Sequence, residues 1–380
     1  MYEFLILVDD YRSELDPRQA SKVQHPLSLV LLLVFICELA GIEHWTEMED
    51  FLIYNRSILE EYLPLEHGIP SHDTLERVMR MISEAVIDEL RACFSEQVAL
   101  DFSDNYQRII SIDGKTVRGN ASSDQKPIHI VTGFDGAHHR SLGQERVTEK
   151  SNEIIAIPYL LRKIDIRKAI ITIDAVGTQK EIARVIIEGK GQYCLAVKGN
   201  QRSLYEDILE YVEEKGLLEK LEKKGLHYST LEQARGQIER RDYWLCPNAK
   251  WLSERHPDWP KLRAIGVTRN QIERDGQLKE EWRYYILSFK PSAKEFSACV
   301  RGHWAVESLH WLLDVVYRED QNKTMDQRTA YHLNALRKVS LLALKCLKFD
   351  KPNLSYRRKC MYVTYHLEEI LKQLGFEARD

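Results

Sequence analysis

Two aspartates each follow a short apolar run of the kind that forms a buried β-strand: Asp113 comes after residues 108–112, and Asp174 comes after residues 169–173. A single aspartate in such a place usually belongs to a turn or caps a helix. Here the arrangement occurs twice, however, and parallel strands of one sheet end at a common edge where ligands bind. We therefore expect the two carboxylates to share a site.

Four ionisable residues further along the chain fall on one side of a predicted helix. At about 100° per residue, His303, Glu307, His310 and Asp314 lie within about 60° of one another around the helix axis. Tryptophan and aliphatic residues flank this stripe, which argues against a face turned freely towards water. Burying such a stripe costs desolvation energy unless a cation or an opposite charge compensates it.

Carboxylates from two strands and one helix would supply the hard oxygen ligands that Mg²⁺ prefers. In a two-metal site the ions lie roughly 4 Å apart; one activates the attacking water or 3′-hydroxyl, and the other stabilises the leaving oxygen. Zinc is the competing metal because the helix stripe carries two histidines. It ranks second, since both ligands from the strands would be aspartates. The sequence thus favours a magnesium-dependent phosphoryl-transfer site.

Several other chemistries are excluded. The tripeptide Gly114-Lys115-Thr116 lacks the glycine that a phosphate-binding loop needs five positions earlier, where Ile109 stands instead. No Gly-x-Ser-x-Gly sequence is present. The seven cysteines are never closer than 14 residues, so no zinc ribbon can form locally, and scattered thiols are typical of a reducing compartment. A net charge of −4 argues against a histone-like DNA binder, although it allows local basic strips.

Helical and β-rich stretches alternate along the chain, and they must position the carboxylates. From about residue 27 to 91 the pattern is helical, with Ser71 or Asp73 as the cap of a helix over 75–82. Strands are predicted over 108–112, 128–134, 141–148, 169–173 and 193–197, with helices at 158–163 and 179–188. After a charged helical stretch at 204–224, a second β-rich region has strands at 228–232, 238–245, 262–268 and 282–288. Helices follow at about 298–317, 327–347 and 361–374.

This order predicts an α/β architecture in four regions. They are an all-α amino-terminal domain (1–100), the first part of an α/β core (101–225), a β-rich insertion (226–292) and a carboxy-terminal helical part of the core that carries the third carboxylate (293–380). The one long apolar run, 27–37, is well short of the ~20 residues that span a bilayer, and it lacks the start of a signal peptide. We therefore expect a cytoplasmic protein without a membrane partner.

The sequence resembles the DDE transposases of bacterial insertion sequences, specifically the H-repeat-associated family, over nearly its whole length. In the amino-terminal region the resemblance is carried by His25-Pro26-Leu27, Ala40-Gly41 and Ser71-His72-Asp73-Thr74. In the core it is carried by Ile112 to Gly119, Glu149 to Ile154, Thr172 to Ala175 with Thr178 to Lys180, and Lys198 to Gln201. Near the carboxy terminus it is carried by His303-Trp304, Glu307, His310-Trp311, Leu313 to Val315 and Glu319-Asp320.

This resemblance implies an RNase H-like core of the retroviral-integrase type and a DDE triad at Asp113, Asp174 and Glu307. These residues would be both the catalytic groups and the ligands of two Mg²⁺ ions, for which Mn²⁺ would substitute. The implied function is cleavage at the ends of an insertion sequence and joining of the 3′-hydroxyls to target DNA. A water or 3′-hydroxyl would attack phosphorus in line, without a covalent protein intermediate.

The chain departs from its relatives in two places. Residues 235–239 look like the family's His-Gly-Arg-Ile-Glu, but Arg stands first and Gln third. Better-studied relatives carry Arg four residues before the glutamate and Lys seven residues after it, where this chain has His303 and Asp314. The roles of that Arg and Lys therefore do not carry over. We expect His303, His310 and Asp314 to lie beside the metal ligands, orienting them or the DNA.

Basic residues cluster near the predicted site and on the insertion. The candidates for DNA contact are Lys115, Arg118, Lys150, Lys198, Arg240 and Arg241. A solvated loop residue is an equally good reading of those near the site. The expected partner is double-stranded DNA, both the terminal inverted repeats and the target, and joining two ends in one complex favours a homodimer on DNA.

Two other functions stay open at this point. An RNase H-like nuclease without strand transfer would share the triad but cut without specific ends. A non-catalytic descendant would only bind DNA or regulate transposition, and the intact triad counts against it.

Overall fold

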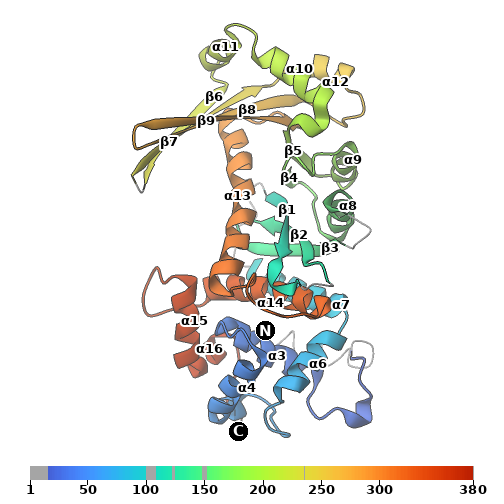
Figure 1. Ribbon diagram of the computed structural model, residues 1–380, viewed down its shortest axis with the longest axis vertical. Helices are drawn as coiled ribbons and strands as arrows, with labels where there is room; N and C mark the ends of the chain where they lie inside the picture. Colours follow the sequence, from blue (N-terminus) through green and yellow to red (C-terminus); the bar gives the residue numbers. More distant parts are fainter. Residues whose placement is uncertain (1–15, 100–107, 122–124, 148–151, 235, 380) are drawn as a thin grey trace.

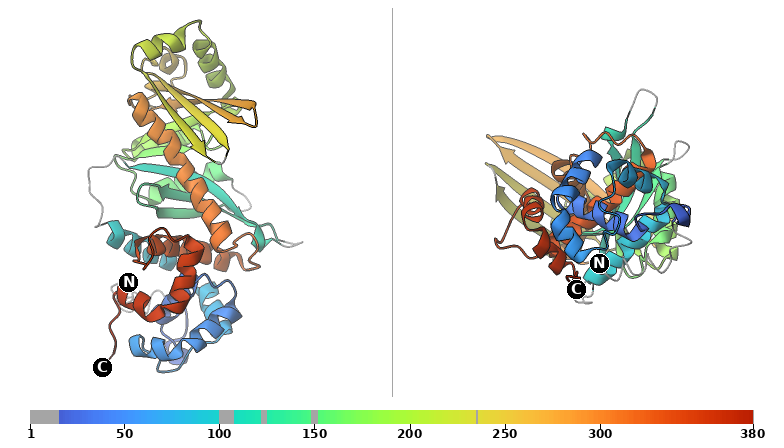
Figure 2. Two further views of the ribbon diagram at one scale, coloured as in Figure 1. Left: turned by 90° about the vertical axis from the view of Figure 1, so that its left-hand side faces the viewer. Right: turned by 90° about the horizontal axis from the view of Figure 1, so that it is seen from below.

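The computed structural model describes residues 16–99, 108–121, 125–147, 152–234 and 236–379. Along its longest axis the molecule has three parts: a group of helices, a central sheet, and a β-rich end covered by further helices (Figure 1). Helix α13 (Ala293–Val316) runs from the β-rich end across the sheet to the helical part (Figure 1, Figure 2). This helix carries Glu307 to the sheet.

One sheet of nine strands, in the order β3-β2-β1-β4-β5-β9-β8-β7-β6, runs through the centre and the β-rich end. The strands are β1 (Ile109–Val117), β2 (Ile128–Asp135), β3 (Arg140–Val147), β4 (Ile170–Ile173), β5 (Gln192–Val197), β6 (His227–Ala234), β7 (Gln237–Cys246), β8 (Ala264–Arg274) and β9 (Gln277–Leu287). Strand β4 is parallel to β1 and β5, and the other neighbouring pairs are antiparallel. This mixed α/β sheet, with helices towards both ends of the chain, confirms the predicted fold class.

The β-rich insertion extends the central sheet. Its last strand, β9, pairs antiparallel with β5, and β8, β7 and β6 follow outwards. Strands β8 and β9 are longer than predicted and are joined through Asp275 and Gly276, whose φ angles of 51° and 73° suit a two-residue hairpin turn. The distal halves are partly or fully exposed on both faces, so mostly polar residues occupy both and the apolar alternation that marks a strand is lost there.

Helices on the two faces of the sheet decide which side chains of β1 face the site. Helices α8 (Glu153–Lys163) and α9 (Lys180–Glu188) cover one face, where Ile110 and Ile112 enter the apolar core. Helix α13 lies against the other face. Because side chains alternate along a strand, Ser111 and Asp113 face α13.

The remaining elements lie at the two ends of the molecule. The β-rich end carries α10 (Arg202–Val212), α11 (Leu217–Lys223) and α12 (Lys250–Arg255). Three short 3₁₀ turns occur elsewhere along the chain: η1 (Ala20–Lys22), η2 (Arg118–Asn120) and η3 (Gly199–Gln201). The helical part contains α3 (Leu27–Leu39), α4 (Trp45–Tyr54), α5 (Arg56–Tyr62), α6 (His72–Met81) and α7 (Glu84–Ala99), together with α14 (Gln327–Cys346), α15 (Tyr356–Tyr365) and α16 (Leu367–Gln373). Ser71 caps α6 by accepting from the Thr74 N–H. The single helix predicted over 361–374 is wrong, because the chain leaves helical geometry at His366.

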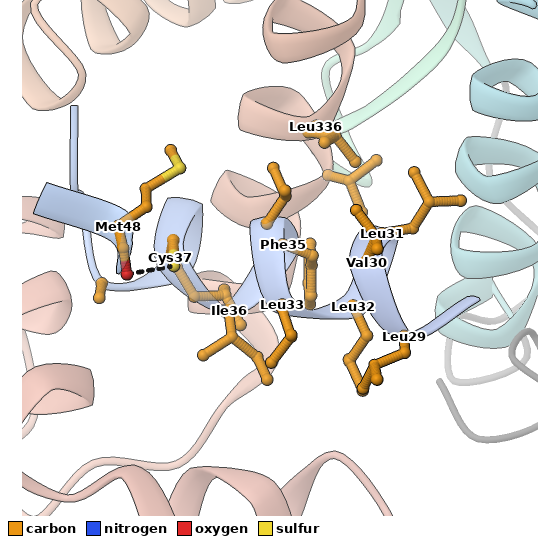
Figure 3. Packing of buried hydrophobic residues seen from close by; sticks show 14 of the residues in the cluster. Leu29, Val30, Leu31, Leu32, Leu33, Phe35, Ile36, Cys37, Met48 and Leu336 are labelled. Atoms are coloured by element: carbon orange, nitrogen blue, oxygen red, sulfur yellow. Dashed lines mark hydrogen bonds between the residues drawn. The ribbon is translucent and has the colours of Figure 1, made fainter. Parts of the chain in front are cut away.

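The amino-terminal helices share one apolar core with the carboxy-terminal helices. All 13 residues of α3 are buried, and Leu336 of α14 lies against this helix (Figure 3). Residues of α15 and α16 complete the same cluster. The core of the amino-terminal helices is therefore closed by residues that follow Glu307 in the sequence. Among the described residues, no helix combines the length and apolar character needed to cross a membrane.

Leu336→Ala tests this shared core. The side chain is fully buried, so its loss should lower the free energy of unfolding by about 2–5 kcal/mol. Urea denaturation should still show one transition, because the two groups of helices depend on each other. The control is Leu278→Ala, at a 62% exposed position on β9, which should change stability by about 0.5 kcal/mol or less. A second transition would show that the amino-terminal helices fold alone.

Lys338 of α14 gives a pH test. Its Nζ donates to Thr132 Oγ1 (2.7 Å) and Gln144 Oε1 (2.9 Å), and burial lowers its pKa to about 7. The unfolded chain binds the proton up to about pH 10, so the stability contributed by Lys338 grows from pH 7 to 10 and is lost as the pH falls through that range. Wild type should therefore gain roughly 1 kcal/mol per pH unit relative to Lys338→Met between pH 7 and 9.5. Urea denaturation of the two proteins measures this difference in unfolding free energy, and a difference that does not change with pH would contradict the prediction.

Candidate active site

Strand β1 contacts helix α13 through three polar side chains at alternate positions of the strand, all on one face. Ser111 Oγ donates to the Gly302 carbonyl (2.9 Å), Asp113 Oδ2 lies 3.4 Å from His310 Nδ1, and Lys115 Nζ lies 2.7 Å from an Asp314 carboxylate oxygen. Gly302 permits the close approach, since a Cβ there would stand 3.0 Å from Ile109 Cγ2. This row of contacts fixes how α13 lies on the strand.

The two aspartates occupy matching positions in the sheet. Ile112 of β1 pairs with Ile173 of β4, the last pair of their parallel ladder, and Asp113 and Asp174 are the next residues. Asp174 follows the end of β4 as predicted. The sequence predicted that Asp113 also follows the end of its strand. This prediction is wrong, because β1 continues to Val117 by antiparallel pairing with β2. The two carboxylates thus lie where β1 and β4 part.

Glu307 meets Asp174 at a cavity of about 180 Å³ between β4, β5, β9 and α13. The side chains around it include Asp174, Lys198, Arg283, His303, Trp304 and Glu307. The Asp174 carboxylate also accepts the Gly177 N–H at 3.0 Å, so it forms a turn as well. Glu307 itself is exposed on α13.

His303 lies within electrostatic reach of all three carboxylates. Desolvation lowers the pKa of its imidazole below the usual value, against the charges of Asp113, Glu307 and Asp174, which each raise it. Asp174 and Glu307 line the same cavity as His303, and Asp113 lies beside Asp174 at the edge of the sheet. Among the described residues, however, no three His, Cys, Asp or Glu side chains form a closed metal-binding group.

A chain of hydrogen bonds fixes the tautomer of His303. The Ser111 proton goes to a carbonyl, so Thr172 Oγ1 donates to Ser111 Oγ (3.2 Å). With its only proton used, Thr172 accepts from His303 Nδ1 (3.1 Å). The neutral ring thus carries its proton on Nδ1, which leaves Nε2 as the acceptor nitrogen of the ring.

Ser111 and Thr172 were not among the site residues predicted from the sequence. Each interrupts an apolar strand two residues before an aspartate, Asp113 or Asp174, and therefore shares its face. That spacing was the available signal.

The Asp113 carboxylate is suited to bind a cation. Burial would raise its pKa, but the hydrogen bond from His310 and the charges of His310 and His303 bring the pKa below its usual value. His310 Nε2 is buried without a hydrogen-bond partner within the described part of the chain. The donor set, three carboxylates beside two histidines, fits a hard divalent ion in chemical type, although the side chains would have to close around it.

The basic residues proposed for DNA contact divide into two groups. Lys198 is exposed at the cavity, Arg118 is exposed with Nε 3.8 Å from Asp320, and Arg240 is exposed on β7. Arg241 and Lys115 are buried instead. Lys150 lies outside the described residues.

The buried pair already have partners inside the protein. Arg241 lies 4.9 Å from the ring centre of Trp304 and 3.1 Å from Glu232, and Lys115 contacts carboxylates. Their charges are compensated internally, which argues against the phosphate contacts expected for them.

Comparison with known proteins gives a consistent result over the whole chain. A family model described as "Transposase DDE domain" matches residues 105–342, and one described as "DDE_Tnp_1-associated" matches residues 14–97. The chain is 36% identical to "Putative protein YbfL" and 35% identical to "H repeat-associated putative transposase YhhI", both of Escherichia coli K12, over 99% of this chain and 98% of each relative. It is also 45% identical to "Inactive transposase YbfQ" of the same organism, over 17% of this chain and 76% of that protein.

Thr172→Val tests the hydrogen-bond chain, because valine keeps the shape and removes the hydroxyl. The variant should lose about 1–3 kcal/mol of unfolding free energy, since Ser111 and His303 each lose a partner. Nitrogen-15 NMR of the wild-type histidine side chains should show Nδ1 of His303 protonated, and the variant should lose this preference. The control is Ser308→Ala on the exposed side of α13, expected within about 0.5 kcal/mol of wild type. A protonated Nε2 in the wild type would contradict the assignment.

Proposed function

Because this chain belongs to the DDE transposase family, we propose that it is a catalytically active, metal-dependent transposase. It cleaves DNA at the ends of its own insertion sequence and joins the freed 3′-hydroxyls to target DNA. Asp113, Asp174 and Glu307 hold the divalent ions, Mg²⁺ or Mn²⁺. Its partners are double-stranded DNA and, in the DNA complex, a second copy of the chain.

One observation carries this proposal: Asp174 and Glu307 line one cavity with His303, and Asp113 stands beside Asp174 at the matching position of the neighbouring strand. A purely structural protein gains nothing from gathering acidic side chains, because their mutual repulsion and desolvation cost stability. The cost is offset when a bound cation compensates the charge. When bound, the ions would activate the attacking hydroxyl and stabilise the leaving oxygen.

The chain's own residues prepare this reaction. His310 holds the Asp113 carboxylate from one side, and its contact keeps that carboxylate ionised. His303 lies at the cavity with Nε2 free to accept a hydrogen bond from the incoming hydroxyl. Lys198 is exposed at the cavity, where its ammonium can meet the phosphates of the DNA backbone, and Arg118 offers an exposed guanidinium just after the end of β1.

Cleavage of a labelled duplex that carries the inverted repeats flanking the gene tests the function. With Mg²⁺ or Mn²⁺, wild type should cut at the repeat boundary, and strand transfer should yield a joined product with a second duplex. Asp113→Asn, Asp174→Asn and Glu307→Gln should each reduce the cleavage rate by about 100-fold or more, because each removes a proposed ligand. Glu188→Gln is the matched control: Glu188 is exposed on α9, across the sheet from α13, and its loss should leave the rate unchanged.

The outcomes separate the three functions. Cutting without joining, at any sequence, would identify a nuclease without strand transfer. Metal-independent binding to the repeats that survives Asp174→Asn, with no cleavage by wild type, would identify a non-catalytic DNA-binding descendant.

A further inference from the structure

Lys115 lies in a cage of three carboxylates. Its Nζ is 2.7 Å from Asp314 Oδ1, 3.2 Å from Asp320 Oδ1 and 3.6 Å from Glu319 Oε2. The lysine side chain is 8% exposed and that of Glu319 is 0% exposed, so DNA could reach the ammonium only by displacing the cage. Although burial opposes the charge, the carboxylates raise the pKa of Lys115 above its usual value. The residue is therefore a fixed internal cation.

The cage joins the strand of Asp113 to the helix of Glu307. Lys115 is two residues after Asp113 and points to the same face of β1. Asp314 is seven residues after Glu307, about two turns along α13 and almost on the same side of it. Fixing Asp314 therefore sets both the rotation of α13 and its position along the strand. Both settings determine where the Glu307 carboxylate points.

The same cation holds the segment that follows α13. Asp320 Oδ1 also accepts the backbone N–H of Arg118 at 3.1 Å, and Glu319 accepts from Asn334 Nδ2 at 2.9 Å. A Cβ at Gly119 would overlap the backbone carbonyl oxygens of Glu319 and Asn322, so the backbone at Gly119 and the segment after α13 lie in direct contact. The end of α13 is thus bound to β1 through Asp314 in its last turn and through Glu319 and Asp320 just after it.

We propose that Lys115 is a positioning residue for the DNA cleavage reaction: by binding Asp314, Glu319 and Asp320 it holds α13 so that Glu307 faces Asp113 and Asp174. The proposal rests on the proposed function. It replaces the phosphate contact expected for Lys115 from its place beside Asp113. Lys198, which is exposed at the same site, is the lysine suited to bind DNA.

Two variants remove the ion pair between Lys115 and Asp314, one from each side. Lys115→Met keeps most of the volume of the side chain without its charge, and Asp314→Asn removes the charge of a 38% exposed partner with little risk to folding. In both, the amides over 308–316 should exchange with deuterium at least tenfold faster than in wild type, because the end of α13 is released. This readout does not depend on activity. Lys198→Met is the matched lysine control and should leave these amides unchanged.

Kinetics on the inverted-repeat duplex then separate positioning from DNA binding. Lys115→Met and Asp314→Asn should each lower the cleavage rate at saturating DNA by at least tenfold and raise the Mn²⁺ concentration for half-maximal rate. The DNA Kd and its salt dependence should stay within about twofold of wild type. The double variant should be no slower than the slower single variant, as expected for two partners of one interaction. Lys198→Met should instead weaken DNA binding and reduce its salt slope by about one.

Each alternative result has a distinct meaning. If Lys115→Met weakens DNA binding with a reduced salt slope while Asp314→Asn behaves like wild type, Lys115 contacts phosphate and the proposal is wrong. Unchanged amide exchange over 308–316 in Asp314→Asn would also overturn it, whatever the activity. If wild type shows no metal-dependent cleavage but the variants still differ from it in amide exchange, the proposed function is wrong. The contacts of Lys115 with the three carboxylates would then be structural only.

Discussion

The polar contact between one face of β1 and helix α13 is the constraint on which the site depends. Glu307 follows Asp174 by 133 residues (307 − 174), so only the docking of α13 brings the glutamate to the aspartates. Apolar packing resists sliding by shape alone, whereas polar contacts also require specific partners. Here a hydroxyl, a carboxylate and an ammonium of β1 each have a partner on α13, and a shift by one residue would break all three contacts and leave the buried Ser111 hydroxyl without its acceptor.

The contact also extends into the helical part of the molecule. Glu319, which binds Lys115, lies 3.5 Å from Arg337 of α14, and Arg337 lies 3.2 Å from Glu38 of α3. Burial raises the pKa of Glu38 to about 7, despite this pairing with Arg337. A continuous row of buried ionisable side chains therefore runs from α3 through α14 to the strand of Asp113. A rearrangement of the amino-terminal helices would reach the site through charge pairing as well as through packing.

Much of this structure could be predicted from local patterns in the sequence. The apolar runs gave the positions of β4 and β5, and the helical spacing gave α13 with its ionisable stripe. The sequence could not show that β1 continues past Asp113, because its later residues are polar and pair with β2. Nor could it show that Lys115 is buried, since its partner Asp314 is 199 residues away. A lysine beside a predicted phosphate site has the same local sequence whether it binds DNA or a carboxylate, and only the tertiary fold decides.

The core that α3 to α7 share with α14 to α16 has a consequence for shortened copies of the gene. A copy cut short between Asp174 and α14 would still encode Asp113, Asp174 and the amino-terminal helices, but its product would leave α3, an apolar helix buried along all 13 residues, without its cover. Such a fragment exposes a large apolar surface and is a substrate for aggregation and proteolysis. Truncation in this range therefore removes more than the last helices, since it also takes away the packing on which the amino-terminal helices depend.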